Sequence, residues 1–393
     1  MNEVVIIDGV RTATGKFNGS LSAIPAPVHG AECVKAIVER NALDKNMIDE
    51  VIIGTHFQAG IKANSARQCA IYAGLPDTIP AFTPNKNCAT ALKAIQLAAQ
   101  SIQVGDNEVV IAGGCETMSD IPYLLKKARF GYRMGPGEVL DSMLYDGLVD
   151  PFMNYHMGIT AENVAEKCGI TREMQDAFAL QSHKKAAKAW AEGKYDQDIV
   201  PITIKGKKGD VVFKTDETFL EDATLENFKK LRPVFKEGGT VTVGNASPVN
   251  DGSAVVLMMS ANKAKELGLK PIARYVASVS TAIHPSIMGY APVSAIEKLE
   301  KKTGISRDQI GLFELNEAFA AQAAACVQDL KLDPEKVNVN GGAVALGHAV
   351  GCTGARISIT LIREMQRRNV QYGVSSLCIG GGQAMAMLFE LVK

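Results

Sequence analysis

Short apolar segments alternate with longer segments of helical periodicity near both ends of the chain. Continuous apolar runs are typical of buried strands, and apolar residues repeated along one face are typical of helices. In the first stretch we predict strands over 3–9, 51–55 and 108–112, and helices over 27–40, 66–73 and 88–104. Strands that alternate with helices through short loops favour a mostly parallel sheet covered on both faces.

The last stretch returns to this pattern. We predict strands over 271–280, 311–315 and 373–379, a further strand at Val337, and helices over 291–302, 317–330 and 351–368. Asn87–Gly114 and Gly351–Gly381 each hold a cysteine and a threonine at a turn, a long helix, an apolar strand and a double glycine. The match favours two halves of similar topology, although any two strand-helix-strand units share part of it.

The middle of the chain differs, because it is charged and rich in Met and Tyr. There we predict helices over 160–168 and 171–192, and a hairpin with its tip at Gly206–Gly209. We interpret this region as an insertion that carries binding residues. An ordinary third lobe without a ligand is the alternative.

The net charge limits the kinds of binding partner that we expect. The 393 residues include 42 Lys and Arg and 42 Asp and Glu, so the formal net charge is zero. Proteins that bind nucleic acid or membrane surfaces usually carry a basic excess, so we expect neither partner. No apolar run reaches the roughly 18 residues that span a membrane, and the first residues lack the pattern of a signal peptide. We therefore expect a cytoplasmic protein.

The eight cysteines and six histidines form no metal-binding pattern, since no CxxC, HExxH or HxH occurs. Gly9–Phe17 only approaches a phosphate-binding loop, because five residues separate its glycines and Phe17 replaces the residue that binds magnesium. We expect no metal and no cofactor.

Cys88 is the first candidate for chemistry, because it opens a predicted helix. The free N–H groups and the partial positive charge of a helix N-terminus stabilise a thiolate. The same N–H groups could bind an oxyanion. A buried core cysteine is the alternative.

Two glycine-rich segments carry further candidates. His348 lies among the five glycines of Gly341–Gly354, and Cys378 comes just before the triple glycine Gly380–Gly382. The histidine could act as a general base toward a thiol, and the second thiol could move protons. Structural turns are the alternative for both. Asn316 and the polar turn Gly244–Ser247 complete the candidates, with helix capping and an ordinary loop as their alternatives.

In their order along the chain, these segments resemble the active-site motifs of the thiolase family. The resembling stretches are NKNCATALKA, NYHMGITAEN, GTVTVGNASPVNDGSA, NEAFA, GGAVALGHAVGCTGAR and CIGGGQA. The resemblance covers the chain from end to end. It implies an α/β thiolase fold of two βαβαβαββ halves in a five-layer α-β-α-β-α arrangement. The N-terminal half would be 1–118 and 250–270, the inserted loop domain 119–249, and the C-terminal half 271–393.

The resemblance also implies an acyltransferase that condenses two acetyl-CoA reversibly to acetoacetyl-CoA and CoA through an S-acetyl-cysteine. Cys88 would take the acyl group, and His348 would accept its proton and, with a water held by Asn316, bind the thioester oxygen. Cys378 would abstract the α-proton of the second acetyl-CoA. The N–H groups of Cys88 and Gly380 would form the other oxyanion hole.

The substrate implied by the resemblance is a short acyl-CoA, because the pair His156-Met157 is similar to that of members acting on acetoacetyl-CoA. Coenzyme A would then be part of the substrate and not a cofactor. The residues expected to bind it are His156, Met157, Phe235, Val243, Ser247, Ala318 and Phe319. A 3-ketoacyl-CoA thiolase of broader chain length and a catalytically silent acyl-CoA or lipid-binding relative are the alternatives.

The sequence departs from the family in the pocket rather than in its catalytic groups. Ala89-Thr90-Ala91 stands where Gly-Ser-Gly is usual, and Ala349-Val350 follows His348 where Pro-Ile is usual. Val243 replaces a small alanine, and Leu220 stands where a basic residue often meets the coenzyme's phosphate. The segment Tyr123–Met143 lies where short-chain members place a tetramer-forming loop, so we expect a homotetramer, built as a dimer of dimers.

Overall fold

The computed structural model describes residues 1–207 and 209–392. The strands are β1 (Val4–Thr12), β2 (Gly15–Lys16), β3 (Glu50–Gly54), β4 (Ala81–Phe82), β5 (Val109–Thr117), β6 (Tyr123–Leu124), β7 (Leu140–Asp141), β8 (Ile199–Val200), β9 (Ile202–Ile204), β10 (Val211–Phe213), β11 (Asn250–Ser260), β12 (Ala273–Ala282), β13 (Leu312–Leu315), β14 (Tyr372–Ile379) and β15 (Gln383–Leu391). The α-helices are α1 (Ala26–Arg40), α2 (Ser65–Tyr72), α3 (Thr90–Val104), α4 (Met157–Cys168), α5 (Arg172–Ala191), α6 (Leu225–Lys229), α7 (Ala261–Glu266), α8 (Ala291–Thr303), α9 (Ala320–Asp329), α10 (Ala343–Leu346) and α11 (Thr353–Arg368).

The long strands form one eleven-stranded sheet in the order β13-β14-β15-β12-β1-β11-β5-β3-β4, with β2 beside β11 and β8 beside β1. Its two halves meet where β1 pairs with β12. The long ladders β1–β11, β11–β5, β12–β15 and β14–β15 are antiparallel, so the prediction of a mostly parallel sheet is wrong. The reason lies in the connections: β14 and β15, for example, are joined by a tight glycine turn, which only an antiparallel pair allows.

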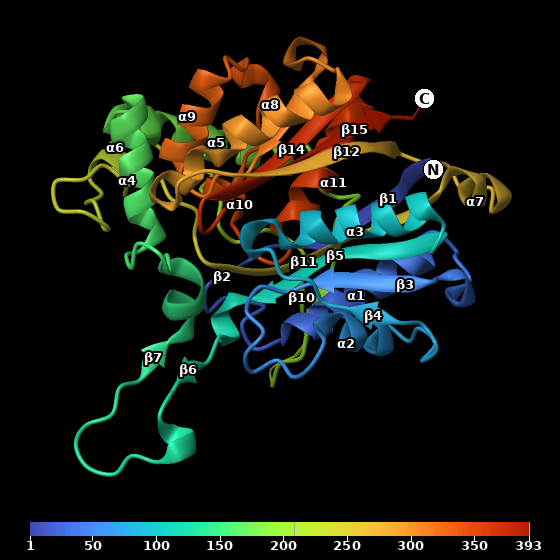
Figure 1. Ribbon diagram of the computed structural model, residues 1–393, viewed down its shortest axis with the longest axis horizontal. Helices are drawn as coiled ribbons and strands as arrows, with labels where there is room; N and C mark the ends of the chain where they lie inside the picture. The colour runs from blue at the N-terminus through green and yellow to red at the C-terminus, as the bar shows by residue number, and fades with distance from the viewer. Residues whose placement is uncertain (208, 393) are drawn as a thin grey trace.

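Helices α3 and α11 form the middle layer (Figure 1). Every residue of α11 from Thr353 to Met365 is buried. Both helices belong to one apolar cluster that also contains Val256 of β11 and Met387 of β15. They are therefore enclosed by strands of both halves. The apolar residues of α11 face this cluster, and the helix also buries Arg356, Arg363 and Glu364.

The outer layers use the opposite faces of the same strands. Val255, next to Val256 on β11, packs with α1 and α2, and Leu388, next to Met387 on β15, packs with α8. Successive strand residues point to opposite faces, so each strand serves two cores. The order α1/α2, strands, α3/α11, strands, α8/α9 confirms the predicted five layers.

The segment 119–249 carries β6 to β10 and α4 to α6. Figure 1 shows the part around β6 and β7 reaching away from the layered body, while α4 and α5 contact α9. Strands β9 and β10 pair antiparallel and confirm the predicted hairpin, although residue 208 of its tip lies outside the described residues. Within the part of the chain that the structure describes, no helix is both long and apolar enough to cross a membrane.

Candidate active site

Cys88 lies in a 3₁₀ turn, Asn87–Ala89, that leads into α3. Asn87 has a φ of 45°, in the left-handed region that asparagine tolerates better than most residues. Thr90 closes the turn, because its hydroxyl accepts a hydrogen bond from the N–H of Lys86 at 2.7 Å. Cys88 therefore precedes the helix, which begins two residues later than predicted.

Burial raises the pKa of the Cys88 thiol to about 11, although main-chain hydrogen bonds at Gly380 and Cys88 itself oppose the shift. The thiolate is the nucleophilic form of cysteine. At neutral pH the side chain is thus a thiol that needs a base, and N–H groups stand ready to stabilise negative charge beside it.

His348 is held from three sides. Its main-chain N–H donates to Oδ1 of Asn250 at 2.9 Å, Nδ1 lies 2.7 Å from Oγ1 of Thr353, and Nε2 lies 3.4 Å from Nδ2 of Asn316. Burial, with the positive charge of Arg356 as a smaller cause, lowers the pKa of His348 to about 3. The imidazole is therefore neutral at pH 7, which is the state that accepts a proton.

Asn316 is itself firmly placed. Its main-chain N–H donates to the carbonyl of Ser376 at 2.9 Å, and its carbonyl accepts from Nε2 of Gln322 at 3.1 Å. The side-chain Oδ1 is buried and has no hydrogen-bond partner among the residues that the structure describes. Buried polar atoms of this kind are usually satisfied by an ordered water, so the position suits a water beside His348.

Cys378 lies near the end of β14, and Gly380 follows it in the turn between β14 and β15. Gly381 and Gly382 have φ values of 83° and 84°, which let the chain reverse sharply. Burial and the neighbouring thiol of Cys88 raise the pKa of Cys378 well above its usual value. A Cβ at Gly380 would lie 2.5 Å from Cε of Met157, so a larger residue at this position would displace the end of that side chain. The turn brings the second cysteine of the pair to the first.

A cavity of about 190 Å³ opens over these groups. Most of the predicted site residues line it, namely Cys88, His156, Met157, Phe235, Ser247, Ala318, Phe319, His348 and Gly380. Two others are buried behind its wall: Asn316 beside His348, and Cys378 in one apolar cluster with Met157. The structure thus gathers residues from 88 to 380 around one space.

Val243 lies elsewhere. Its side chain is 65% exposed and lines a neighbouring groove that also contains Leu220 and His183. The groove and the cavity share Ala246 and Pro248, so they are adjoining parts of one hollow. Val243 can therefore touch only a ligand long enough to leave the cavity.

His156 shapes the cavity more directly than its sequence position suggests. Its ring stacks on Phe235 with centroids 4.5 Å apart, and its Nδ1 accepts a hydrogen bond from the N–H of Gly158 at 3.0 Å. His156 thereby caps α4, which begins at Met157 and not at Thr160 as predicted. The cap places Met157 against Gly380.

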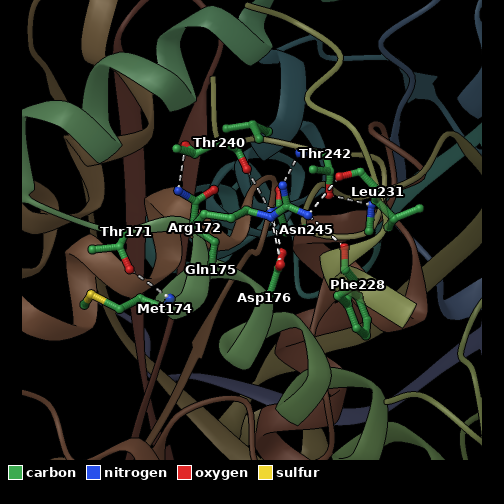
Figure 2. A network of polar contacts seen from close by, with 12 residues as sticks. Thr171, Arg172, Met174, Gln175, Asp176, Phe228, Leu231, Thr240, Thr242 and Asn245 are labelled. Carbon is green, nitrogen blue, oxygen red and sulfur yellow. Dashed lines mark hydrogen bonds and ion pairs between the residues drawn. The ribbon is translucent and has the colours of Figure 1, made fainter. Parts of the chain in front are cut away.

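The polar turn around Asn245 is held by a buried network (Figure 2). Nδ2 of Asn245 donates to Asp176 at 2.9 Å, and Asp176 is in turn paired with Arg172 at 2.7 Å. Oδ1 of Asn245 accepts from the N–H of Thr242 at 2.8 Å, and its carbonyl accepts from Ala320 at 2.8 Å. Asn245 therefore has a structural role, which fixes the neighbouring residues on the cavity wall.

Sequence reasoning missed one wall of the cavity. Phe57, Met118 and Val350 form an apolar cluster against Cys88, and His56 lines the cavity next to them. Val350 belongs to the motif around His348, but no motif marks His56, Phe57 or Met118. His56 and Phe57 directly follow the predicted strand 51–55, where side chains of an α/β sheet often reach a ligand.

Glu116 connects the segments of this wall through hydrogen bonds. Its Oε2 accepts from the N–H groups of His56 at 3.0 Å and Gly351 at 2.9 Å, and its Oε1 accepts from Phe57 at 3.2 Å. The carboxyl is 1% exposed, and burial raises its pKa to about 8. A single side chain of the first half therefore holds the loop that follows His348 in the second half.

Among residues 1–207 and 209–392, no three His, Cys, Asp or Glu side chains are grouped so that they could hold a metal ion. The groups available at the cavity include the thiols of Cys88 and Cys378, the imidazole of His348 and main-chain N–H donors. This set suits acyl transfer through a thioester.

Comparison with known proteins identifies the family. The model of the thiolase N-terminal domain matches residues 4–262, and the model of the thiolase C-terminal domain matches residues 269–391. The chain belongs to the thiolase family.

Relatives of this thiolase match over their whole length. It is 50% identical to the acetyl-CoA acetyltransferase of Cupriavidus necator, over 99% of this chain and 100% of that protein, and 50% identical to the probable acetyl-CoA acyltransferase of Staphylococcus aureus strain COL, over 100% of both. The crystal structure of the Bacillus anthracis acetyl-CoA acetyltransferase superimposes with a TM-score of 0.98 at 46% identity, covering 100% of this chain and 99% of that one.

Proposed function

We propose that this thiolase is an acetyl-CoA C-acetyltransferase, which condenses two acetyl-CoA reversibly to acetoacetyl-CoA and free CoA. The relatives with that activity in their names are similar over their full length. The observation that carries the proposal is that Cys88 and neutral His348 line one cavity, with Cys378 buried next to Cys88.

In the first half-reaction, Sγ of Cys88 would attack the thioester carbonyl of acetyl-CoA while Nε2 of His348 takes the thiol proton. The carbon–sulfur bond to CoA then breaks, and the proton passes to the departing CoA sulfur. Protonated His348 and a water held by Asn316 would stabilise the oxyanion, since donors aimed at developing charge lower the barrier. Acetyl-Cys88 and CoA are the products.

In the second half-reaction, Cys378 would pass its proton to neutral His348, and the thiolate would remove an α-proton from a new acetyl-CoA. The resulting carbanion attacks the carbonyl of acetyl-Cys88, the bond to the Cys88 sulfur breaks to give acetoacetyl-CoA, and the Cys88 thiolate takes the proton held by His348. The N–H groups of Cys88 and Gly380 would stabilise the oxyanion, because their hydrogen bonds to the sulfur of Cys88 already lower the pKa of that thiol. Run in reverse, the same steps are thiolysis.

The test is thiolysis of acetoacetyl-CoA by CoA, followed by the loss of the substrate's enolate absorbance, with wild type and Cys88→Ser side by side. We expect a signal from wild type only. A flat trace for both would overturn the proposal and direct attention to longer or branched acyl groups. Equal rates for both would remove Cys88 from its proposed role.

Other classes are separated by simple measurements. A condensing enzyme that uses an acyl-carrier protein would replace the second cysteine with histidine, so Cys378 argues against it. A silent binding relative would bind acyl-CoA without turnover. Iodoacetamide should label Cys88 quickly, and acetyl-CoA should protect it, only if Cys88 is the nucleophile.

We also propose that the enzyme assembles as a homotetramer. The projecting segment between β6 and β7 exposes large apolar side chains, including Phe130 at 89% and Met134 at 99%. Apolar surface of this kind is usually covered by a partner. Light scattering should give a mass of four chains, and a stable dimer at micromolar concentration would contradict it. A cytoplasmic location stays a prediction, which cell fractionation would test.

A further inference from the structure

The hydroxyl of Thr353 lies between one nitrogen atom and one oxygen atom of the site. It is 2.7 Å from Nδ1 of His348 and 2.8 Å from the carbonyl oxygen of Ala349, and all three groups are buried. A hydroxyl carries one proton. It can therefore donate to only one of these two neighbours.

The carbonyl of Ala349 can only accept, so the two possible arrangements are not equivalent. If the Thr353 proton went to Nδ1, two oxygen atoms would face each other at 2.8 Å with no proton between them. If it goes to Ala349, the hydroxyl oxygen is free to accept, and Nδ1 of His348 must carry the proton that it donates. Only the second arrangement satisfies both contacts.

Asn316 leads independently to the same assignment. Its Nδ2, which can only donate, lies 3.4 Å from Nε2 of His348. An amide nitrogen next to a ring nitrogen is favourable when that ring nitrogen is unprotonated. Both neighbours of the ring thus favour a proton on Nδ1 and a lone pair on Nε2.

We propose that Thr353 is a positioning residue for the reaction, and that its hydroxyl holds His348 as the tautomer with a proton on Nδ1 and a free lone pair on Nε2. This inference rests on the base role proposed above for His348. The proton leaves Sγ of Cys88, and Nε2 takes it, so that the ring becomes an imidazolium with both nitrogens protonated. Thr353 continues to accept from Nδ1 in that state and stabilises it.

The position of Thr353 at the start of α11 favours this positioning role. Thr353 is the first residue of α11, and its hydroxyl bonds back to the carbonyl four residues earlier, a bond that Ser and Thr commonly make in helices. The branched side chain restricts χ1, so the accepting oxygen stays in place. A Cβ at Gly354 would lie 2.4 Å from the main-chain nitrogen of Leu92, so glycine here lets this turn lie close to α3.

The test compares Thr353→Val, Thr353→Ser and Thr360→Val in the thiolysis assay. Valine keeps the shape of threonine and removes the hydroxyl, so kcat should fall about 10²-fold, near the lower end of what general base catalysis contributes. Serine keeps the hydroxyl and should restore most of the rate. Thr360 is the matched control, because its buried hydroxyl on the same helix has no partner, and its loss should leave kcat unchanged.

A second readout separates positioning from packing. The rate of Cys88 alkylation by iodoacetamide is measured against pH for each variant. Loss of the acceptor at Nδ1 makes the imidazolium harder to form, so the apparent pKa of Cys88 should rise in Thr353→Val and stay in place in Thr360→Val. KM for acetoacetyl-CoA should change far less than kcat.

The outcomes distinguish this inference from the proposal beneath it. If His348→Asn is inactive while Thr353→Val matches wild type in kcat and in the pH profile, the inference is wrong and the base role of His348 stands. If His348→Asn matches wild type, the base role itself fails. Equal losses in Thr353→Ser and Thr353→Val would point to packing of the methyl group and would also overturn the inference.

A measurement on the wild-type enzyme covers the case in which Thr353→Val does not fold. Nitrogen NMR of enzyme labelled at histidine distinguishes protonated from unprotonated ring nitrogens, and His348→Asn identifies the signals of His348. We expect Nδ1 to be protonated and Nε2 to be unprotonated. The opposite pattern would overturn the inference without any Thr353 variant.

Discussion

The amide nitrogen of Asn316 lies 3.4 Å from Nε2 of His348, while the amide oxygen of the same side chain is buried without a partner. The amide nitrogen of Asn316 therefore faces the imidazole of His348. The amide oxygen has no hydrogen-bond donor among the described residues. A water bound there would stand next to the imidazole, where the thioester oxygen is expected.

The first prediction concerns this amide. Asn316→Ala should lower kcat for thiolysis about 10²-fold, the usual cost of losing one donor at an oxyanion. Asn316→Asp keeps the size of the side chain but places a negative charge beside His348, which favours the protonated ring and should shift the acid limb of the pH–rate profile to higher pH. Wild-type turnover in Asn316→Ala would show that neither the amide nor its water takes part.

The second prediction concerns the ionisation of Cys88. Because burial raises the pKa of this thiol to about 11, the thiolate fraction should increase about tenfold for each pH unit between pH 7 and pH 10. The alkylation rate of Cys88 by iodoacetamide, measured at fixed reagent concentration, should rise in parallel. Cys88→Ser serves as the control for labelling elsewhere. A rate independent of pH above 7 would mean that thiolate and imidazolium are already paired in the resting enzyme.

The third prediction concerns chain length. Met157 borders the cavity and packs against Gly380, so Met157→Ala should open room for longer acyl groups. Wild type should prefer acetoacetyl-CoA strongly over a C16 substrate. The ratio of kcat/KM for a C8 3-ketoacyl-CoA over acetoacetyl-CoA should rise about tenfold in the variant, the size of effect expected for a few added methylene groups.

Met174→Ala is the matched control for this change. Met174 is 41% exposed on α5 and does not line the active-site cavity. Its truncation should leave the ratio unchanged. Comparable turnover of C4 and C16 substrates by wild type would contradict the prediction, and so would an unchanged ratio in Met157→Ala.

Much of the fold follows from local pattern. The buried run of β1 and the apolar periodicity of α3 predict those elements, although β1 extends three residues beyond the predicted end and α3 begins two residues after the predicted start. Strand direction could not be predicted in the same way, because β11 pairs with β1 and β5 only after a long insertion returns the chain to the sheet. No local signal carries that information.

The proposed catalytic residues could be selected because they stand in recognisable local contexts. His348 and Cys378 lie in glycine-rich motifs, Cys88 lies at the start of a predicted helix, and the structure brings the three together. Val350 belongs to the motif around His348, but its contact with Phe57 depends on tertiary packing and could not be predicted. Glu116 was a signal that could have been used, since an acidic residue inside a buried strand must have partners.

The last prediction concerns Glu116, whose two oxygens hold the N–H groups of His56, Phe57 and Gly351. Glu116→Ala leaves three buried donors unsatisfied, so it should lower the free energy of unfolding by about 3 kcal/mol or more and reduce kcat as the cavity wall loosens. In Glu116→Gln, the amide oxygen in the place of Oε2 still accepts from the N–H groups of His56 and Gly351. It should therefore cost clearly less, which chemical denaturation of both variants would measure.

The raised pKa of Glu116 also predicts that the free energy of unfolding decreases as the pH rises. The pKa of Glu116 is raised from 4.5 to about 8 by burial, so the folded protein holds a proton that the unfolded chain releases. The stabilising contribution of the protonated carboxyl is complete below pH 4.5 and is lost as the pH rises toward 8. Relative to Glu116→Gln, which does not titrate, wild type should lose about 1.4 kcal/mol per pH unit over that range. A stability difference that stays constant from pH 5 to pH 8 would show that Glu116 is already ionised in the folded enzyme, held as a carboxylate by its three N–H donors.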